Sequence, residues 1–99
     1  MSGQGPEKRI ENKIKRYLDS IGAWHMKVHG SMFTKSGTPD IIACVQGEFI
    51  AIEVKRPEGG KVSELQKVQI DLIHKAGGHA FVARSLEETK AYFEENYLV

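Results

Sequence analysis

TPDIIACVQGEFIAIEVK, residues 38–55, sets the fold of this chain. Two runs rich in β-branched residues, Ile41–Val45 and Glu48–Lys55, are separated by the dipeptide Gln46-Gly47. Two such runs joined by two residues that end in glycine are typical of a β-hairpin. The sequence therefore predicts two antiparallel strands connected by a tight turn.

The register of this hairpin brings three charged side chains together. Counting outward from Val45 opposite Glu48, Asp40 lies directly opposite Glu53, and opposed residues have Cβ atoms roughly 4.5–5.5 Å apart. Lys55 follows Glu53 by two residues, so alternation along the strand places it on the same face. We therefore expect two carboxylates and one ammonium at one end of the hairpin.

This pair of carboxylates needs a neutralising partner. Adjacent carboxylates repel one another, and one pKa rises unless a cation is present. Mg²⁺ prefers oxygen ligands, binds few protein carboxylates, and keeps positions for water and phosphate. Asp40 and Glu53 are thus candidate metal ligands, and Lys55 is suited to orient a water molecule or to stabilise charge on a phosphate. The alternative is a solvated strand face on which Glu53 and Lys55 form an ordinary ion pair.

Pro39-Asp40 followed by Glu53-Val54-Lys55 resembles the signature of the PD-(D/E)XK nucleases. The fuller strings, GTPD at 37–40 and AIEVK at 51–55, are similar to the VRR-NUC (virus-type replication-repair nuclease) branch. The similarity covers almost the whole chain and continues in two later motifs and the first expected helix: SELQ at 63–66, AGG at 76–78, Glu7 and Glu11.

The resemblance implies an α/β restriction-endonuclease-like core and a metal-dependent nuclease. It implies that Glu11, from the first helix, joins Asp40 and Glu53 in binding Mg²⁺ or Mn²⁺. The carbonyl of Val54 is a further possible ligand, and Glu7 is the alternative to Glu11.

The resemblance also implies that Asp40, Glu53, Lys55 and Gln66 are catalytic. Lys55 would position or help to deprotonate a water molecule, and the amide of Gln66 would assist it. The spacing of Ser63 and Gln66 is also that of a helix capping box, so capping alone would account for Gln66.

The residues around Glu11 leave its role open. It lies at the edge of an apolar stripe that includes Ile14 and Leu18, where a carboxylate is unfavourable unless a cation meets it. A simple ion pair with Lys15, four residues later on the same helix face, would satisfy it equally well.

Hydrophobic periodicity predicts the order α-β-β-β-α-β-α, with one mixed sheet flanked by helices. The expected helices span Pro6–Ile21, Ser63–Ala76 and a segment from Ser85, and the remaining strands span Ala23–Val28 and His79–Arg84. In the second helix one group of side chains forms an apolar stripe, a pattern typical of the side that faces a core: Leu65, Val68, Leu72, Ile73 and Ala76.

Length and composition predict one domain over residues 1–99, which the resemblance implies is a VRR-NUC nuclease domain, with residues 1–5 disordered. The single cysteine, Cys44, lies in an expected strand and is predicted to be a buried, reduced residue. The longest apolar run has only five residues, Ile41–Val45, so neither a membrane span nor a secretory signal is expected. We expect a soluble protein of the cytoplasm, which is that of a bacterial host if the source is viral.

The formal net charge is only +1, but basic residues concentrate in the first two thirds of the chain. Residues 1–67 contain 11 Lys and Arg against 8 Asp and Glu, whereas residues 68–99 contain 3 against 5. This distribution favours a phosphate-backbone partner near the predicted site. The candidate DNA contacts are Lys27, His29, Lys35 and Arg56.

Together these features predict a structure-specific DNA endonuclease that hydrolyses phosphodiester bonds with Mg²⁺ or Mn²⁺ and no nucleotide cofactor. The small members of this superfamily suggest a dimeric Holliday-junction-resolving enzyme, since a C₂ dimer matches a four-way junction. Met32-Phe33 and the exposed side of the C-terminal helix are candidate dimer surfaces. The alternatives are a nickase, a flap nuclease, or a catalytically silent DNA-binding subunit.

Overall fold

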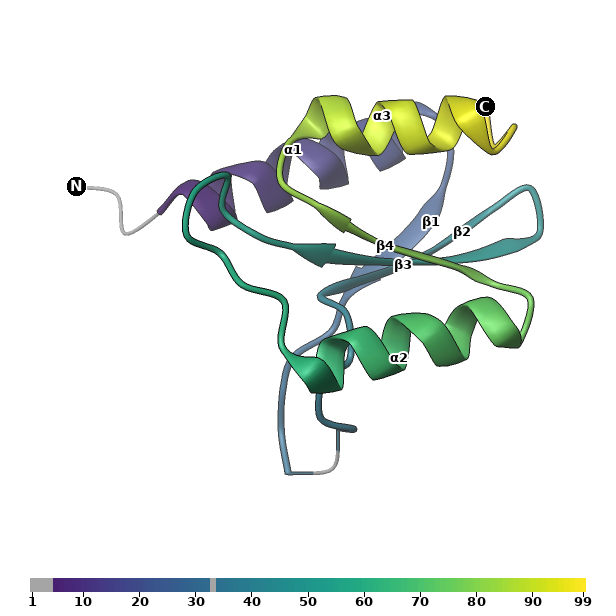
Figure 1. Cartoon of the computed structure of the whole chain (residues 1–99). Coiled ribbons are helices and arrows are strands. Elements are labelled where there is room, and N and C mark those ends of the chain that lie inside the picture. The colour runs from purple at the N-terminus through teal and green to yellow at the C-terminus, as the bar shows by residue number, and fades with distance from the viewer. Residues whose placement is uncertain (1–4, 33) are drawn as a thin grey trace.

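Three helices and four strands follow in the predicted order in the computed structural model, which describes residues 5–32 and 34–99 (Figure 1). The elements are α1 (Pro6–Ser20), β1 (Trp24–Lys27), β2 (Ile41–Val45), β3 (Glu48–Val54), α2 (Glu64–Lys75), β4 (His79–Ala83) and α3 (Leu86–Glu95). Most of the segment predicted to be disordered, residues 1–4, lies outside the described residues, as does Phe33.

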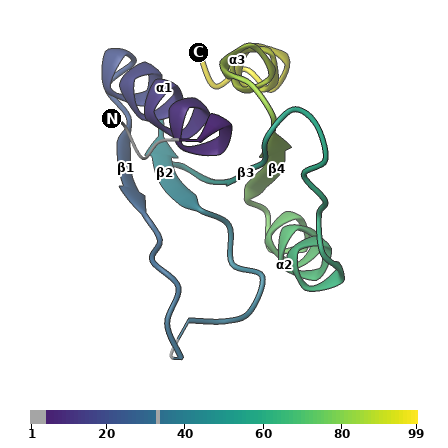
Figure 2. The same cartoon turned by 90° about the vertical axis from the view of Figure 1, so that its left-hand side faces the viewer.

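The strands form one sheet in the order β1-β2-β3-β4. The first two pairings are antiparallel and β3 pairs with β4 in parallel, which confirms the predicted mixed sheet. α1 and α3 lie over one face of the sheet, and α2 lies on the other (Figures 1 and 2). α2 provides the crossover between the two parallel strands, as parallel pairing requires.

The β2–β3 hairpin has the predicted register. Val45 pairs with Glu48, and pairing continues to Ile41 opposite Ile52. The turn residues Gln46 and Gly47 have φ values of 52° and 81°, as a type I′ hairpin turn requires. This turn fixes which residues meet at the far end of the hairpin.

The core lies between the sheet and the helices α1 and α3. Ile14 and Leu18 of α1 and Phe93 of α3 are fully buried against the strands. The strand residues beneath them alternate with residues of the other face, as expected for pleated strands: Ile41, Ala43, Val45, Ile50, Ile52 and Val54. Within the described residues no helix combines the length and the apolar character needed to cross a bilayer.

Most of the apolar stripe of α2 does not face a core, contrary to what its pattern indicates, because only Ile73 of its five residues lies on the side toward the sheet. All of α2 lies within the described residues, and none of its 12 residues is buried. Leu65, Val68 and Leu72 are 56%, 50% and 51% exposed. The reason is that α2 turns a neighbouring side to the sheet, and the half-buried residues on that side are Gln66, Gln69, Ile70 and Ile73.

Cys44 is exposed, so the prediction that it is buried is wrong. It alternates with the core residues Ala43 and Val45 and therefore points to the face that α1 and α3 do not cover. The periodicity of a strand does not reveal which of its two faces remains uncovered.

Candidate active site

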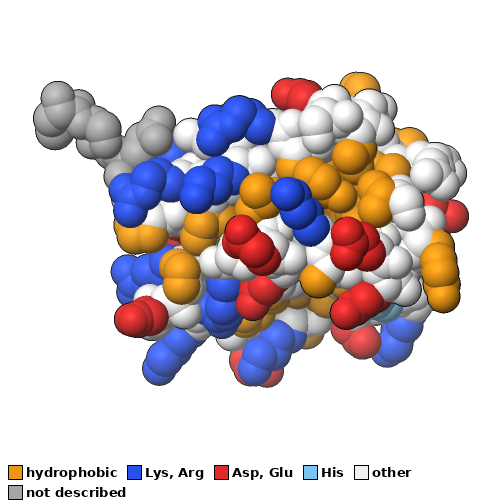
Figure 3. Space-filling model, turned by 90° about the horizontal axis from the view of Figure 1, so that it is seen from above, with side chains coloured by type: hydrophobic (Ala, Val, Ile, Leu, Met, Phe, Trp, Pro, Cys, Tyr) orange, Lys and Arg blue, Asp and Glu red, His pale blue; other side chains and the backbone are white. Residues whose placement is uncertain are grey.

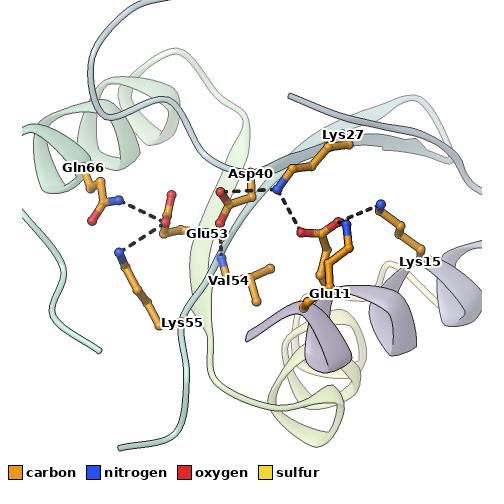
Figure 4. A network of polar contacts seen from close by, with 9 residues as sticks. Glu11, Lys15, Lys27, Asp40, Glu53, Val54, Lys55 and Gln66 are labelled. Atoms are coloured by element: carbon orange, nitrogen blue, oxygen red, sulfur yellow. Dashed lines mark hydrogen bonds and ion pairs between the residues drawn. The ribbon is translucent and has the colours of Figure 1, made fainter. Parts of the chain in front are cut away.

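The predicted site residues gather at one end of the sheet, where β2 begins, β3 ends and the first halves of α1 and α2 approach (Figures 2 and 4). Asp40 immediately precedes β2, after the buried Pro39. Its backbone carbonyl accepts a hydrogen bond from the N–H of Val28 at 2.7 Å, which fixes the chain just before the strand.

Asp40 and Glu53 lie next to one another, as the register predicted (Figure 4). The backbone ladder ends at Ile41 opposite Ile52, and the Asp40 side chain continues it. Asp40 Oδ2 accepts a hydrogen bond from the N–H of Val54 at 2.8 Å, so the sheet itself orients this carboxylate.

Glu53 is buried, and its two carboxylate oxygens have different surroundings. Oε2 accepts a hydrogen bond from Gln66 Nε2 at 3.0 Å and lies 3.4 Å from Lys55 Nζ. Oε1 is also buried but has no hydrogen-bond partner among residues 5–32 and 34–99. A buried charged oxygen without a partner is costly, so this atom marks a place where a cationic group would be favourable.

The pKa of Glu53 reflects the same shortage of positive charge. Burial, together with the negative charge of Asp40, raises the pKa of Glu53 to about 7, although Lys55 opposes the rise. The ammonium of Lys55 is therefore insufficient to offset the burial of Glu53 and the charge of the neighbouring carboxylate.

Gln66 makes the capping contacts that its sequence position allowed and also contacts Glu53, while its catalytic role stays a prediction. The side chain completes a capping box, because Oε1 accepts from the N–H of Ser63 at 2.9 Å and the Gln66 N–H donates to Ser63 Oγ at 3.1 Å. The Nε2 group of the same amide donates to Glu53. The cap at the start of α2 thus orients a side chain of the site.

Glu11 is buried among three ammonium groups. Its carboxylate oxygens lie 3.1 Å from Lys8 Nζ, 2.7 Å from Lys15 Nζ and 2.8 Å from Lys27 Nζ. Although burial alone would raise the pKa of Glu11, its hydrogen bonds with Lys15, Lys27 and Lys8 lower it to about 2. The ion pair with Lys15 exists, but it is only one of three. The alternative ligand Glu7 is exposed at the start of α1.

Lys27 connects Glu11 to the two carboxylates at the hairpin. Its Nζ atom lies 2.8 Å from Glu11 Oε1 and 3.8 Å from Asp40 Oδ1 (Figure 4). The sequence interpretation placed Lys27 among the DNA contacts and missed this bridge. The pairing of Lys27 with Ile41 across β1 and β2 produces it, and no local pattern indicates that register.

The other three candidate DNA contacts lie at exposed positions. His29 and Lys35 belong to the segment between β1 and β2, which extends away from the sheet beside α2 (Figure 1). Arg56 follows β3, and its Nη2 atom lies 3.5 Å from the carbonyl oxygen of Gly59. Of the four candidate DNA contacts, Lys27 therefore differs from the other three, because it is partly buried and bound to Glu11.

The structure does not assemble the three predicted acidic ligands around one point. In the described parts of the chain, no group of three or more His, Cys, Asp and Glu side chains is arranged to bind a metal ion. Asp40 and Glu53 form a pair with one unpartnered oxygen, and Glu11 is joined to them only through Lys27. Val54 is buried, with its N–H bonded to Asp40.

The fold is that of VRR-NUC domains. A structure described as a VRR_NUC domain superposes with a TM-score of 0.79 and 25% identity, covering 95% of this chain and 99% of the other. A second, a VRR_NUC domain protein, shares the fold with a TM-score of 0.73 at 18% identity over 96% and 89% of the two chains.

A third similar structure is a Holliday junction resolvase, Hjc from Archaeoglobus fulgidus. It has a TM-score of 0.59 and 27% identity, covering 76% of this chain and 64% of the other. No relative with a curated description matches the chain by sequence.

The sequence matches a family model over residues 4–98, almost its entire length. These comparisons support a nuclease of the resolvase type and confirm the predicted restriction-endonuclease-like core. The chain belongs to the archaeal Holliday junction resolvase (Hjc) family, a PD-(D/E)XK-type nuclease family, and has the fold of a VRR-NUC domain.

Proposed function

We propose that this protein is a metal-dependent endonuclease that acts as a dimer and cuts two strands of a four-way DNA junction. The observation that carries the proposal is the buried Oε1 atom of Glu53, which has no partner in the described residues and lies beside the second carboxylate, Asp40. Two carboxylates in this arrangement suit a divalent cation that retains positions for water and phosphate.

The residues of this end of the sheet fit Mg²⁺ or Mn²⁺. Asp40 and Glu53 would be its carboxylate ligands, with the carbonyl of Val54 as a further ligand. The bound ion would lower the pKa of a water molecule and offset negative charge on the scissile phosphate.

The side chains around the pair have separate tasks in this proposal. Gln66 fixes Glu53 Oε2, so that Oε1 remains available for the ion. The ammonium of Lys55, 3.4 Å from the same carboxylate, would stabilise the negative charge that forms when a water molecule loses its proton. The backbone N–H of Val54 keeps Asp40 oriented before the substrate arrives.

The role of Glu11 as a third metal ligand stays a prediction. In the observed arrangement its oxygens are already occupied by three lysines, which favours an indirect role. By binding Lys27, Glu11 places that ammonium 3.8 Å from Asp40 Oδ1, where its charge lowers the cost of ionising the carboxylate pair.

The match to the Hjc family supports the choice of a branched substrate. Two copies of a small domain related by a two-fold axis would present two active sites to the two strands of a symmetric junction. His29, Lys35 and Arg56 are exposed and suited to phosphate contacts, which add affinity without reading sequence.

The deciding experiment compares labelled four-way junction, flap and linear duplex substrates of matched sequence, with Mg²⁺, Mn²⁺ or a chelator. We expect paired incisions near the crossover with either metal, little cutting of linear duplex, and no cutting with Asp40→Asn. Cutting mainly at a flap would replace the resolvase by a flap nuclease, and binding without cutting in either metal would favour a silent DNA-binding subunit.

A further inference from the structure

Residues 56–60, which we call the connector, lead from the active-site end of β3 toward α2 and are held by an arginine distant in the sequence. Arg84 directly follows β4 and is half-buried (Figure 2). Its Nη1 atom donates hydrogen bonds to the carbonyl oxygen of Arg56 at 3.0 Å and to that of Gly60 at 2.8 Å. One charged nitrogen therefore joins the two ends of the connector.

The guanidinium of Arg84 has backbone partners rather than acidic ones. Among residues 5–32 and 34–99 it forms no ion pair with a carboxylate, and its acceptors are the two carbonyl oxygens. Hydrogen bonds from a charged donor are stronger than those between neutral groups. Many other Lys and Arg side chains lie on the outer surface, for example over the face that α1 and α3 form (Figure 3). The contacts of Arg84 thus indicate that it fixes the backbone of the connector.

The backbone of Arg84 is itself fixed at the start of α3. Its N–H donates to Glu88 Oε1 at 2.6 Å, and Ser85 Oγ caps the helix by accepting from the N–H of Glu88 at 3.1 Å. The preceding residue, Ala83, accepts a hydrogen bond at 3.0 Å from the N–H of Lys55, the residue just before the connector. The end of β4 and the cap of α3 therefore form a firm base for the guanidinium.

The connector packs against the side chain of Lys55. A Cβ added to Gly60 would lie 3.2 Å from Lys55 Cβ and 3.0 Å from the carbonyl oxygen of Arg56. The Lys55 side chain is only 14% exposed, and its Nζ atom lies 3.4 Å from Glu53 Oε2. Because Gly60 leaves so little space beside this side chain, a shift of the connector would move Lys55 relative to the carboxylate.

We propose that Arg84 is a positioning residue of the nuclease, which fixes both ends of the connector and so holds the ammonium of Lys55 beside Glu53. The inference rests on the proposed function in treating Lys55 as part of the active site. Arg84 acts through the connector, and small displacements of a reacting group are enough to slow an enzyme strongly. Asp40 is oriented by the backbone of β3 instead, so metal binding should not depend on Arg84.

The first test compares the cutting kinetics of two substitutions at Arg84 on a labelled four-way junction with Mg²⁺. Arg84→Met keeps a long side chain but removes the donors, whereas Arg84→Lys keeps the charge and N–H groups. For Arg84→Met we expect kcat to fall about tenfold or more, with KM and the Mg²⁺ requirement within about twofold of the wild type. Arg84→Lys should recover much of the loss.

The control is Arg16→Met, which removes an exposed arginine of α1 and should leave kcat unchanged. Urea unfolding of each variant shows that the rates are measured on folded protein, because a purely structural role would slow cutting only through the unfolded fraction. Wild-type kcat in Arg84→Met, or a loss that lies mainly in KM, would overturn the proposal.

Gly60→Ala tests the path through the connector while Arg84 remains in place. The added methyl group would press on Lys55 Cβ and on the carbonyl oxygen of Arg56, so we expect a lower kcat with KM unchanged. Gly30→Ala, whose Cβ would meet nothing within 4 Å, is the matched control. A Gly60→Ala variant with the kcat of the wild type would contradict the path.

Hydrogen exchange of the metal-free protein tests the same contact without relying on cutting. The amides of residues 58–61 should exchange faster in Arg84→Met than in the wild type, whereas those of α1 should be unchanged. Unchanged exchange in the connector would refute the role of Arg84. A wild type that cuts no substrate would instead refute the nuclease, while faster exchange in Arg84→Met would still show that Arg84 holds the connector.

Discussion

The amide of Gln66 donates to Glu53 Oε2 at 3.0 Å while its own oxygen caps α2 at Ser63, so one side chain joins the helix terminus to the carboxylate pair. A structural cap and a site contact are usually made by different residues. Here the sequence from Ser63 to Gln66 supplies both, which makes the geometry at Glu53 depend on how firmly α2 is attached.

This double role predicts different effects for two substitutions. Gln66→Glu keeps an oxygen for the Ser63 N–H but turns a second oxygen toward Glu53, so we expect junction cutting to fall by about tenfold or more through carboxylate repulsion. Ser63→Ala removes the cap without touching Glu53 and should cost about 1 kcal/mol of unfolding free energy. Cutting rates and urea unfolding separate the two, and equal losses of cutting would show that Gln66 only caps the helix.

Glu53 should make the metal-free protein less stable as the pH rises. Its pKa is raised from 4.5 to about 7, so the folded state binds the proton more tightly than the unfolded chain. The stabilising contribution of the protonated group is complete below pH 4.5 and is lost as the pH rises through about 7. The loss is on the order of 3 kcal/mol.

Glu53→Gln removes this titration. In chelator, urea unfolding at about pH 5 and about pH 8 should show a smaller loss of stability for Glu53→Gln than for the wild type. Adding Mg²⁺ at about pH 8 should stabilise the wild type but not Glu53→Gln, since a ligand stabilises only the state that binds it. Identical pH profiles, or an equal effect of Mg²⁺ on both proteins, would contradict the assignment.

Glu11 should have the opposite dependence on pH. Its pKa is lowered from 4.5 to about 2, so its ion pairs stabilise the fold above pH 4.5 and are lost as the pH falls toward 2. Because its lysine partners are partly exposed, we expect Glu11→Gln to cost about 2 kcal/mol near neutral pH and little in acid. The exposed Glu7 provides the control, and Glu7→Gln should change nothing.

The same variant decides how Glu11 contributes to catalysis. If Glu11 acts through Lys27, Glu11→Gln should slow cutting yet retain most of the stabilisation by Mg²⁺. Complete loss of that stabilisation, measured by thermal unfolding with and without the ion, would make Glu11 a ligand as the family resemblance implies.

Gly37, the first residue of the GTPD motif, should not tolerate a side chain. It has a φ of +84°, and an added Cβ would lie 2.4 Å from the backbone carbon and oxygen of Leu65. Gly37→Ala should therefore cost on the order of 2 kcal/mol and slow cutting by pushing the start of α2 away from Glu53. Gly30→Ala, whose Cβ would meet nothing within 4 Å, is the control. Similar stability of both variants would contradict the close contact.

The hairpin shows how much of the candidate site can be predicted from local sequence alone. A two-residue turn at Gln46-Gly47 fixes every later pair, so placing Asp40 next to Glu53 needed only counting and the alternation of strand residues. The capping box at Ser63 is equally local. The order of the elements followed from periodicity for the same reason, since each signal lies within one segment.

Contacts between segments that are distant in the sequence could not be predicted from such local patterns. The pair of Glu11 and Lys27 joins residues 16 positions apart and depends on how α1 docks on the sheet and on the register of β1 with β2. The exposure of Cys44 and of the α2 stripe depends on which half of a sheet face α2 covers. Spacing along the chain set the hairpin and its carboxylate pair because those distances are fixed by backbone geometry. The docking of α1 and α2 on the sheet determined which lysines surround Glu11 and left the apolar stripe of α2 exposed. Burial and long-range ion pairs exist only once separate elements meet.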